Sequence, residues 1–138
     1  MSTFIQRVGT TYVPVADPQK ASEWYQQNLG AKETFSNHDK VILDLANQSF
    51  FLVKAKQGER VGFLDYNGYE HFTMTFEVNG YSELANFHTL LKSKGVSVGE
   101  IEDRGHPGNN FVFYDLNGNK FDVWSELSPM FKEKYQVD

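Results

Sequence analysis

Residues 8–30 read VGTTYVPVADPQKASEWYQQNLG, and this stretch joins a strand directly to a helix. The β-rich run Val8–Val15 predicts the strand. Asp17 is a good N-cap, the proline after it suits the first helical position, and Gly30 provides a stop signal. We therefore predict a helix over residues 18–29, immediately after the first strand.

The same plan returns in the second half of the chain. Residues 71–78 alternate polar and apolar side chains, which predicts a strand with two different faces. A helical apolar stripe follows over residues 82–94, and Gly95 ends it. The order β, α, β, β, β thus occurs twice, and Val15 superposes on Val78. The later β-rich runs are 32–35, 41–45 and 49–53, then 96–101, 110–114 and 120–124.

The length fits one compact core, so we predict a single domain over residues 1–138. The repeat divides it into a first module of about residues 4–54 and a second of about 71–127. Residues 55–70 have the composition of a connector loop. The tail, 128–138, contains apolar residues that suit a short packing helix.

The composition is that of a soluble globular protein. It is 40% hydrophobic and 15% aromatic, which is enough for a core and for the lining of a pocket. The absence of cysteine excludes disulfide scaffolds and thiolate sites and is compatible with the cytoplasm, our default location. The net charge is −5 with scattered Lys and Arg, so we expect no nucleic-acid partner. No signal peptide or membrane span is expected, because residues 1–7 and the rest of the chain lack a long apolar run.

The order and spacing of several short motifs resemble the vicinal oxygen chelate superfamily of glyoxalases, bleomycin-resistance proteins and extradiol dioxygenases. The similarity covers roughly residues 4–127. It implies an α+β fold of tandem βαβββ modules that form a curved, half-open mixed-sheet barrel with the helices outside, and it also implies a homodimer. The motifs are Val13–Pro18, Trp24-Tyr25, Leu29-Gly30, Phe76–Val78, Lys94–Val96 and Phe113–Asn119.

Metal-using members of this superfamily hold one divalent cation, and the resemblance places its ligands at Thr10, Phe50, Thr73 and Asp122. Only Asp122 is a strong ligand, because a neutral hydroxyl is a poor donor and a phenyl ring offers no lone pair. We therefore expect no metal cofactor. A divalent metal stays possible at a shifted site formed by His71 and Asp122, since His71 shares the predicted strand face of Thr73.

The concave sheet is instead predicted to bind a small, partly aromatic organic molecule. Inward strand positions make an apolar, aromatic pocket with a few polar handles, which is typical of a small-molecule site. The loop around His106 forms one possible edge. The predicted ligand-binding residues are Thr10, Tyr12, Phe50, Leu52, His71, Thr73, Thr75, Asp122 and Trp124.

Three alternatives stay open at this point. The chain could be a glyoxalase-like lyase or isomerase, or a dioxygenase-like enzyme, with an atypical metal site. Bulky side chains could fill the sheet and leave no cavity, or an exposed sheet edge could serve as an interaction module. Asp122 itself either faces a solvated cavity or forms a salt bridge with Arg104 or Lys120.

Overall fold

The computed structural model describes residues 4–138, so the part of the signal-peptide prediction that concerns residues 1–3 lies outside the described residues. The chain forms two compact units, residues 1–60 and 61–138, and the boundary between them falls inside the predicted connector. Both units combine helices with mixed sheets, so the α+β fold class is confirmed. The assignment of one domain to the whole chain stays a prediction.

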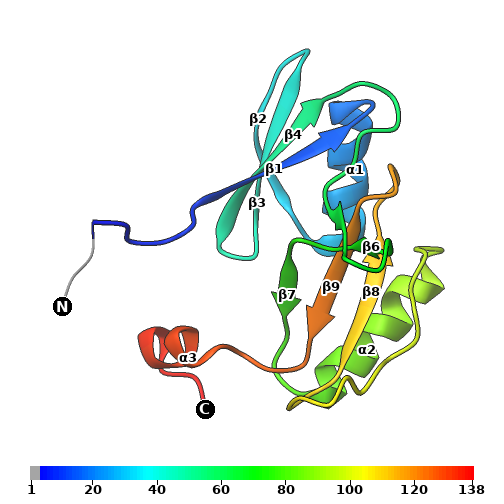
Figure 1. Cartoon of the computed structure of the whole chain (residues 1–138). Helices are drawn as coiled ribbons and strands as arrows, with labels where there is room; N and C mark the ends of the chain where they lie inside the picture. Colours follow the sequence, from blue (N-terminus) through cyan, green and yellow to red (C-terminus); the bar gives the residue numbers. More distant parts are fainter. Residues whose placement is uncertain (1–3) are drawn as a thin grey trace. The chain divides into compact units, whose positions relative to one another are not determined.

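The first unit follows the predicted order of elements (Figure 1). These are β1 (Thr10–Val15), α1 (Pro18–Leu29), β2 (Lys32–Ser36), β3 (Lys40–Leu45) and β4 (Gln48–Lys54). The strands lie in the order β1-β4-β3-β2, with β1 parallel to β4 and the other pairs antiparallel. The predicted first helix is confirmed at both ends.

The local signals around α1 act as predicted. Asp17 has an extended backbone, and its side chain accepts a hydrogen bond from the Lys20 N–H, one of the donors left open where a helix begins. Gly30 has a φ of 71°, the left-handed conformation that ends many helices. The helix packs against β2, β3 and β4. The buried apolar core here comprises Val13, Val15, Ala21, Tyr25, Ala31, Val41, Leu43, Phe50 and Leu52.

The second unit repeats this plan with a three-stranded sheet. Its main elements are β7 (Thr75–Glu77), α2 (Tyr81–Ser93), β8 (Asn110–Tyr114) and β9 (Lys120–Trp124). The strands lie in the order β7-β9-β8, with β7 parallel and β8 antiparallel to β9. The second predicted helix is confirmed to within one residue at each end. It contacts one face of the sheet through Phe87, whose ring lies 6.0 Å from that of Phe111 on β8.

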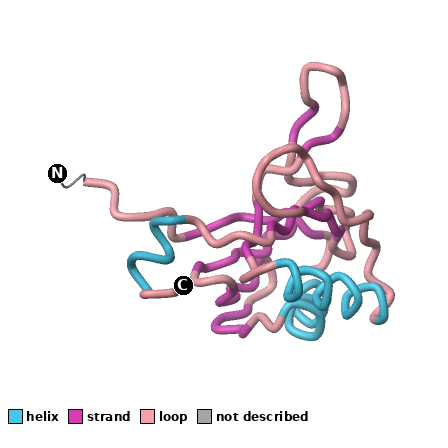
Figure 2. The backbone as a smooth tube through the Cα atoms, turned by 90° about the horizontal axis from the view of Figure 1, so that it is seen from below, coloured by secondary structure: helices cyan, strands magenta, loops and turns pink. Residues whose placement is uncertain are grey.

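A third helix, α3 (Pro129–Tyr135), follows the last strand, as predicted for the tail. In Figure 1 α2 and α3 are drawn on opposite sides of the sheet of the second unit, and Figure 2 shows the same backbone from below with helices and strands in separate colours. The backbone N–H and the hydroxyl of Ser128 both donate to the carboxylate of Glu77, which ties the start of α3 to the end of β7. No helix within residues 4–138 is long and apolar enough to cross a membrane.

The predicted strand over residues 71–78 is wrong in its first half. Only Thr75–Glu77 pairs with β9. His71 ends a different strand, β6 (Glu70–His71), which pairs antiparallel with β5 (Phe63–Leu64). All of this short hairpin except His71 lies in the segment predicted as a connector loop, and its pairing keeps His71 out of the ladder formed by β7.

The predicted strand over residues 96–101 does not form a continuous ladder. Val98 bridges Phe113 and Glu102 bridges Asn110, and the register of these two bridges differs by one residue. Such a shift is a bulge, which interrupts regular pairing. The segment therefore follows the edge of β8 irregularly and then leads into the loop before that strand.

Candidate functional site

In the first unit the predicted site residues lie on two opposite faces of the sheet. The register of β1 and β4 places Val13 beside Leu52 and Tyr12 beside Phe51. Phe50 and Leu52 share the face of Val13, where they are 1% and 0% exposed. The prediction that Tyr12, Phe50 and Leu52 share one inward face is therefore wrong for the two β4 residues, which pack in the core.

The same registers correct the proposed counterpart of Asp122 in the first module. Tyr12 superposes on Thr75 in the repeat. Tyr12 pairs with Phe51, whereas Thr75 pairs with Asp122. The counterpart of Asp122 is therefore Phe51 and not Phe50, although a phenyl ring stands at either position and neither can bind a cation.

The turns before the two last strands differ in length by three residues, so a superposition of the turns does not decide which residues of these strands correspond. Residues 46 and 47 form a two-residue turn between β3 and β4, and both have positive φ, as such hairpins require. The turn between β8 and β9 contains five residues, 115–119. Superposing Ala46 on Gly118 matches Phe50 with Asp122, whereas pairing with the first strand of each module matches Phe51 with Asp122.

Thr10 and Tyr12 lie on the sheet face opposite to α1, as predicted. Tyr12 is 63% exposed, and its ring centroid lies 5.1 Å from that of Phe51. Thr10 is half-buried at the start of β1. These residues form a partly aromatic surface. The buried polar cluster around Asp122 lies in the second unit.

Asp122 on β9 is the centre of that buried cluster. It is only 2% exposed, and its Oδ2 accepts hydrogen bonds of 2.9 Å from both Thr75 Oγ1 and Asn110 Nδ2. Its Oδ1 lies 3.1 Å from Nη1 of Arg104, an ion pair without hydrogen-bond geometry. Of the two salt bridges considered for this carboxylate, the one with Arg104 forms, while Lys120 donates instead to a backbone carbonyl.

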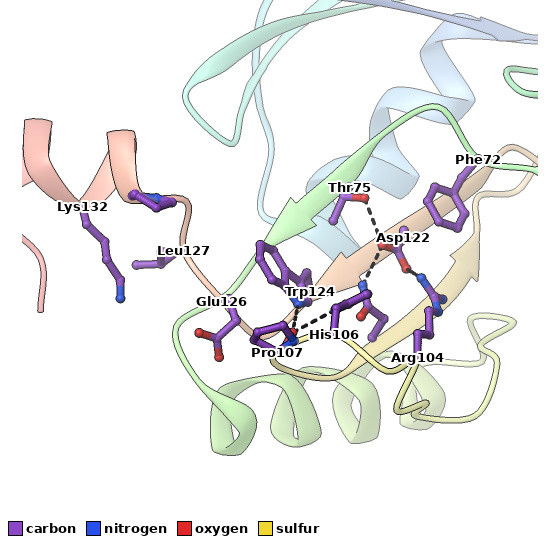
Figure 3. Close-up of a pocket in the computed structure, with 12 residues that line it drawn as sticks. Phe72, Thr75, Arg104, His106, Pro107, Asp122, Trp124, Glu126, Leu127 and Lys132 are labelled. Carbon is purple, nitrogen blue, oxygen red and sulfur yellow. Dashed lines mark hydrogen bonds and ion pairs between the residues drawn. The ribbon is translucent and has the colours of Figure 1, made fainter.

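The cluster opens on a cavity of about 800 Å³ (Figure 3). Thr75 pairs with Asp122, and Asn110 pairs with Trp124, so these four side chains share the sheet face opposite to α2. Figure 3 places Trp124, Thr75 and Asp122 side by side on this face. The cavity is lined by Phe72, Thr75, Arg104, His106, Pro107, Asn110, Asp122, Trp124, Glu126, Leu127, Pro129 and Lys132.

The loop between residues 103 and 109 fixes one wall of the cavity. The Trp124 indole N–H donates to the Pro107 carbonyl over 2.9 Å, and the His106 ring meets the indole edge-on at 5.9 Å. Ser125 fixes the end of the loop: its N–H donates to the Asn109 carbonyl, and its hydroxyl oxygen accepts from the Asn109 N–H. The indole is therefore held in one orientation before any ligand arrives.

Two predicted residues of the second module, His71 and Thr73, do not line this cavity. The His71 ring stacks on Phe63 at 5.1 Å, and its Nδ1 lies 2.7 Å from the Phe72 carbonyl. Thr73 is exposed in the bend between β6 and β7. Thr75, Asp122 and Trp124 are the predicted residues that the fold brings together.

Most of the other residues that line the cavity were not predicted from the sequence. Asn110 could have been found, because it opens a predicted strand beside the last one. The predicted alternation of residues 71–78 placed Phe72 on the strand face opposite to Thr75. This assignment does not apply, because β6 ends at His71 and β7 begins only at Thr75. The tail residues Leu127, Pro129 and Lys132 carry no recognisable motif, since their role depends on where α3 lies.

Comparison with known proteins agrees with this fold. Residues 7–123 match the Glyoxalase/Bleomycin resistance protein/Dioxygenase superfamily. The chain belongs to this superfamily, as its sequence motifs indicated. No curated protein sequence matches the chain.

Solved structures of low sequence identity share the fold. Lactoylglutathione lyase from Agrobacterium tumefaciens is 14% identical with a TM-score of 0.70, over 88% of this chain and 95% of that one. The fosfomycin resistance protein FosX from Listeria monocytogenes, complexed with Mn(II) and sulfate, is 15% identical with a TM-score of 0.71, over 96% and 99%. An integron cassette protein from the metagenome of Halifax Harbour sewage outfall is 20% identical with a TM-score of 0.70, over 88% and 100%.

The residues around Asp122 do not fit the divalent metal that the superfamily implies. Its carboxylate oxygens already face a guanidinium, a hydroxyl and an amide N–H. Within residues 4–138 no group of three or more His, Cys, Asp or Glu side chains is placed to hold a metal ion. A cation at Asp122 would displace Arg104, and the other imidazole and carboxylate of the cavity wall, His106 and Glu126, do not form a ligand group with Asp122.

Proposed function

We propose that the chain binds a small, partly aromatic organic molecule in the cavity beside Asp122, without the metal that its superfamily implies. The observation that carries this proposal is an aromatic-walled cavity of about 800 Å³ next to a carboxylate that already contacts Arg104, Thr75 and Asn110. Small-molecule sites are typically concave, mostly apolar and about 300–1,000 Å³ in volume, with a few fixed polar groups.

The wall of the cavity is suited to an aromatic ligand. Trp124 offers the largest π surface, and its hydrogen bond to Pro107 removes the need to order it on binding. Phe72 also lines the cavity and lies beside Arg104, whose guanidinium carbon is 5.4 Å from the centroid of the phenyl ring. A flat ligand would exchange hydration for contact with these rings, which is worth about 25 cal/mol per Å² of apolar area buried.

The enzyme alternative, a glyoxalase-like lyase or isomerase or a dioxygenase-like enzyme, required His71 and Asp122 to hold a metal together. His71 stacks on Phe63 and does not line the cavity. No specific contact favours this second function, so the binding function is the conclusion. A homodimer and a cytoplasmic location remain predictions from the resemblance and the composition.

Thermal-shift screening against a panel of aromatic compounds tests the proposal. We expect stabilising ligands, because a ligand at a hundred times its Kd stabilises the folded state by about 2.7 kcal/mol. Trp124→Ala should abolish the shift. Leu127→Asp offers a milder second variant, since it places a charge in the cavity wall outside the sheet.

Tyr66→Ala is the matched control, because it removes an aromatic side chain that is 98% exposed and does not line the cavity. It should leave the ligand-induced shift unchanged. The proposal fails if no compound stabilises the protein, or if the shift persists in both cavity variants.

A further inference from the structure

We infer that α3 is a lid hinged at Ser128, that it swings over Trp124 to enclose a ligand, and that the structure describes its open position. This inference rests on the proposed function and adds a conformational step to the same site. Three observations support it: α3 supplies one wall of the cavity, it buries none of its own residues, and the residue before it has the backbone freedom of a hinge.

The segment that contains α3 borders the cavity without covering it. Leu127, Pro129 and Lys132 line the cavity together with Trp124. Figure 3 shows Leu127 and Lys132 on one side of Trp124 and Arg104 on the other, and Figure 1 draws α3 clear of the strands of this unit. Pro129 and Lys132 are three residues apart, so they share one face of the helix. This face is the one that meets the cavity.

The attachment of α3 to the rest of its unit is weak. None of its seven residues is buried, and Met130 is 84% exposed. The rings of Phe131 and Tyr135 lie 4.6 Å apart, a contact within the helix itself. By contrast, α2 buries Leu84 and Leu91 completely. Segments with few buried apolar contacts open at the lowest free energy, so α3 can move without disturbing the core.

Ser128 joins α3 to the sheet and can act as the hinge. Its N–H donates to Glu77 Oε1 over 2.8 Å, which fixes the chain just before the helix. Its φ of −62° lies at one end of the extended region, which reaches about −160°, and the proline that follows keeps it in this region. A turn about this bond carries α3 as a unit and leaves the N–H bond in place. Seven helical residues span about 10 Å, so the lid can move by a distance of this order.

A ligand would supply the free energy that keeps the lid closed. An aromatic ring stacked on Trp124 has one face against the indole, and its other face stays in water while α3 is open. Closing would cover that face with the apolar side chains of Leu127 and Pro129, which is worth about 25 cal/mol per Å² of apolar area buried. Because these contacts exist only in the closed position, the ligand shifts the population toward it.

Disulfide trapping in the full chain, without any ligand, tests the lid. The chain has no cysteine, so Lys132→Cys with His106→Cys introduces a single pair. Figure 3 places Lys132 and His106 on opposite sides of Trp124. A disulfide requires Cα atoms within about 7 Å, so an intramolecular crosslink reports that α3 has crossed the indole. We expect this crosslink to form with oxidised glutathione and to be reversed by reduction.

Lys134→Cys with His106→Cys is the matched control. Lys134 lies two residues further along the same helix and does not line the cavity, so it faces away from His106 when the lid closes. We expect the Lys132 pair to crosslink at least about tenfold faster than the Lys134 pair, since the rate of disulfide formation follows access. Equal rates, or no intramolecular crosslink in either pair, would overturn the inference.

A second measurement checks that the trapped helix covers the indole. Trp24→Phe leaves Trp124 as the single tryptophan, so its fluorescence can be followed alone. We expect the crosslinked chain to be at least about twofold less sensitive to acrylamide quenching than the reduced chain, because the closed lid excludes the quencher from the cavity. Unchanged quenching would show that the helix does not close over Trp124.

The outcomes distinguish this inference from the proposed function, because trapping uses no ligand. Stabilising compounds in the thermal-shift panel without selective crosslinking would overturn the lid and leave the binding function standing. A blank panel would overturn the binding function, and with it the role of α3 in enclosing a ligand.

Discussion

Asp122→Ala is expected to lower the free energy of unfolding by about 3 kcal/mol. Removing one member of a buried ion pair typically costs about 3–5 kcal/mol, because the other charge loses its partner. Here the Arg104 side chain is 24% exposed, so water can partly hydrate its charge once Asp122 is removed. We therefore expect a cost at the lower end of this range. The donors of Thr75 and Asn110 would also lose their acceptor. Denaturant unfolding measures the change.

Glu102→Ala is the matched control, because Glu102 pairs with the same arginine but its side chain is 51% exposed. We expect it to cost less than about 1 kcal/mol, the usual range for a surface ion pair. Equal effects of the two variants would show that the buried cluster at Asp122 does not stabilise the fold as described.

Gly108→Ala is expected to destabilise the protein by about 2–5 kcal/mol and to disturb the environment of Trp124. A Cβ at this position would lie 2.7 Å from Glu126 Cγ and 2.8 Å from both Ser125 Oγ and Trp124 Nε1. Overpacking of this kind costs about 1–3 kcal/mol. The φ of 78° adds the cost of a left-handed residue, about 1–2 kcal/mol.

Gly105→Ala separates these two costs. Gly105 has a similar φ of 87° in the same loop, but a Cβ there meets no atom within 4 Å. We expect only the left-handed cost of about 1–2 kcal/mol and an unchanged near-UV circular dichroism signal of the tryptophans. If both variants behave alike, the close approach of the loop to Trp124 is not tight.

The sequence predicted the elements whose signals are local. Asp17 and Gly30 mark α1 through their own hydrogen bonding and φ, so both of its ends were correct. The order of elements along the chain, β, α, β, β, β, also followed from the repeat and is complete in the first unit. The hairpin of β5 and β6 was missed because it lies in a segment whose polar composition is typical of a loop, although Asn67-Gly68 is a turn signal.

The candidate site was predicted only in part, because the strand faces in the first module were assigned from a superposition that the register of β1 with β4 corrects by one residue. Phe50 and Leu52 share the face of the buried Val13, opposite to that of Tyr12. Asp122 was found because a carboxylate in the middle of an apolar strand requires a partner or a cavity. Its partner, Arg104, lies on an irregular segment whose path no local pattern indicates.

Elemental analysis of protein purified without chelators or a metal-binding tag tests the central claim most directly. We predict far less than one equivalent of Zn, Ni, Mn or Fe per chain, because the carboxylate oxygens of Asp122 already contact Arg104, Thr75 and Asn110. About one equivalent of any of these metals, lost in Asp122→Ala, would contradict the account.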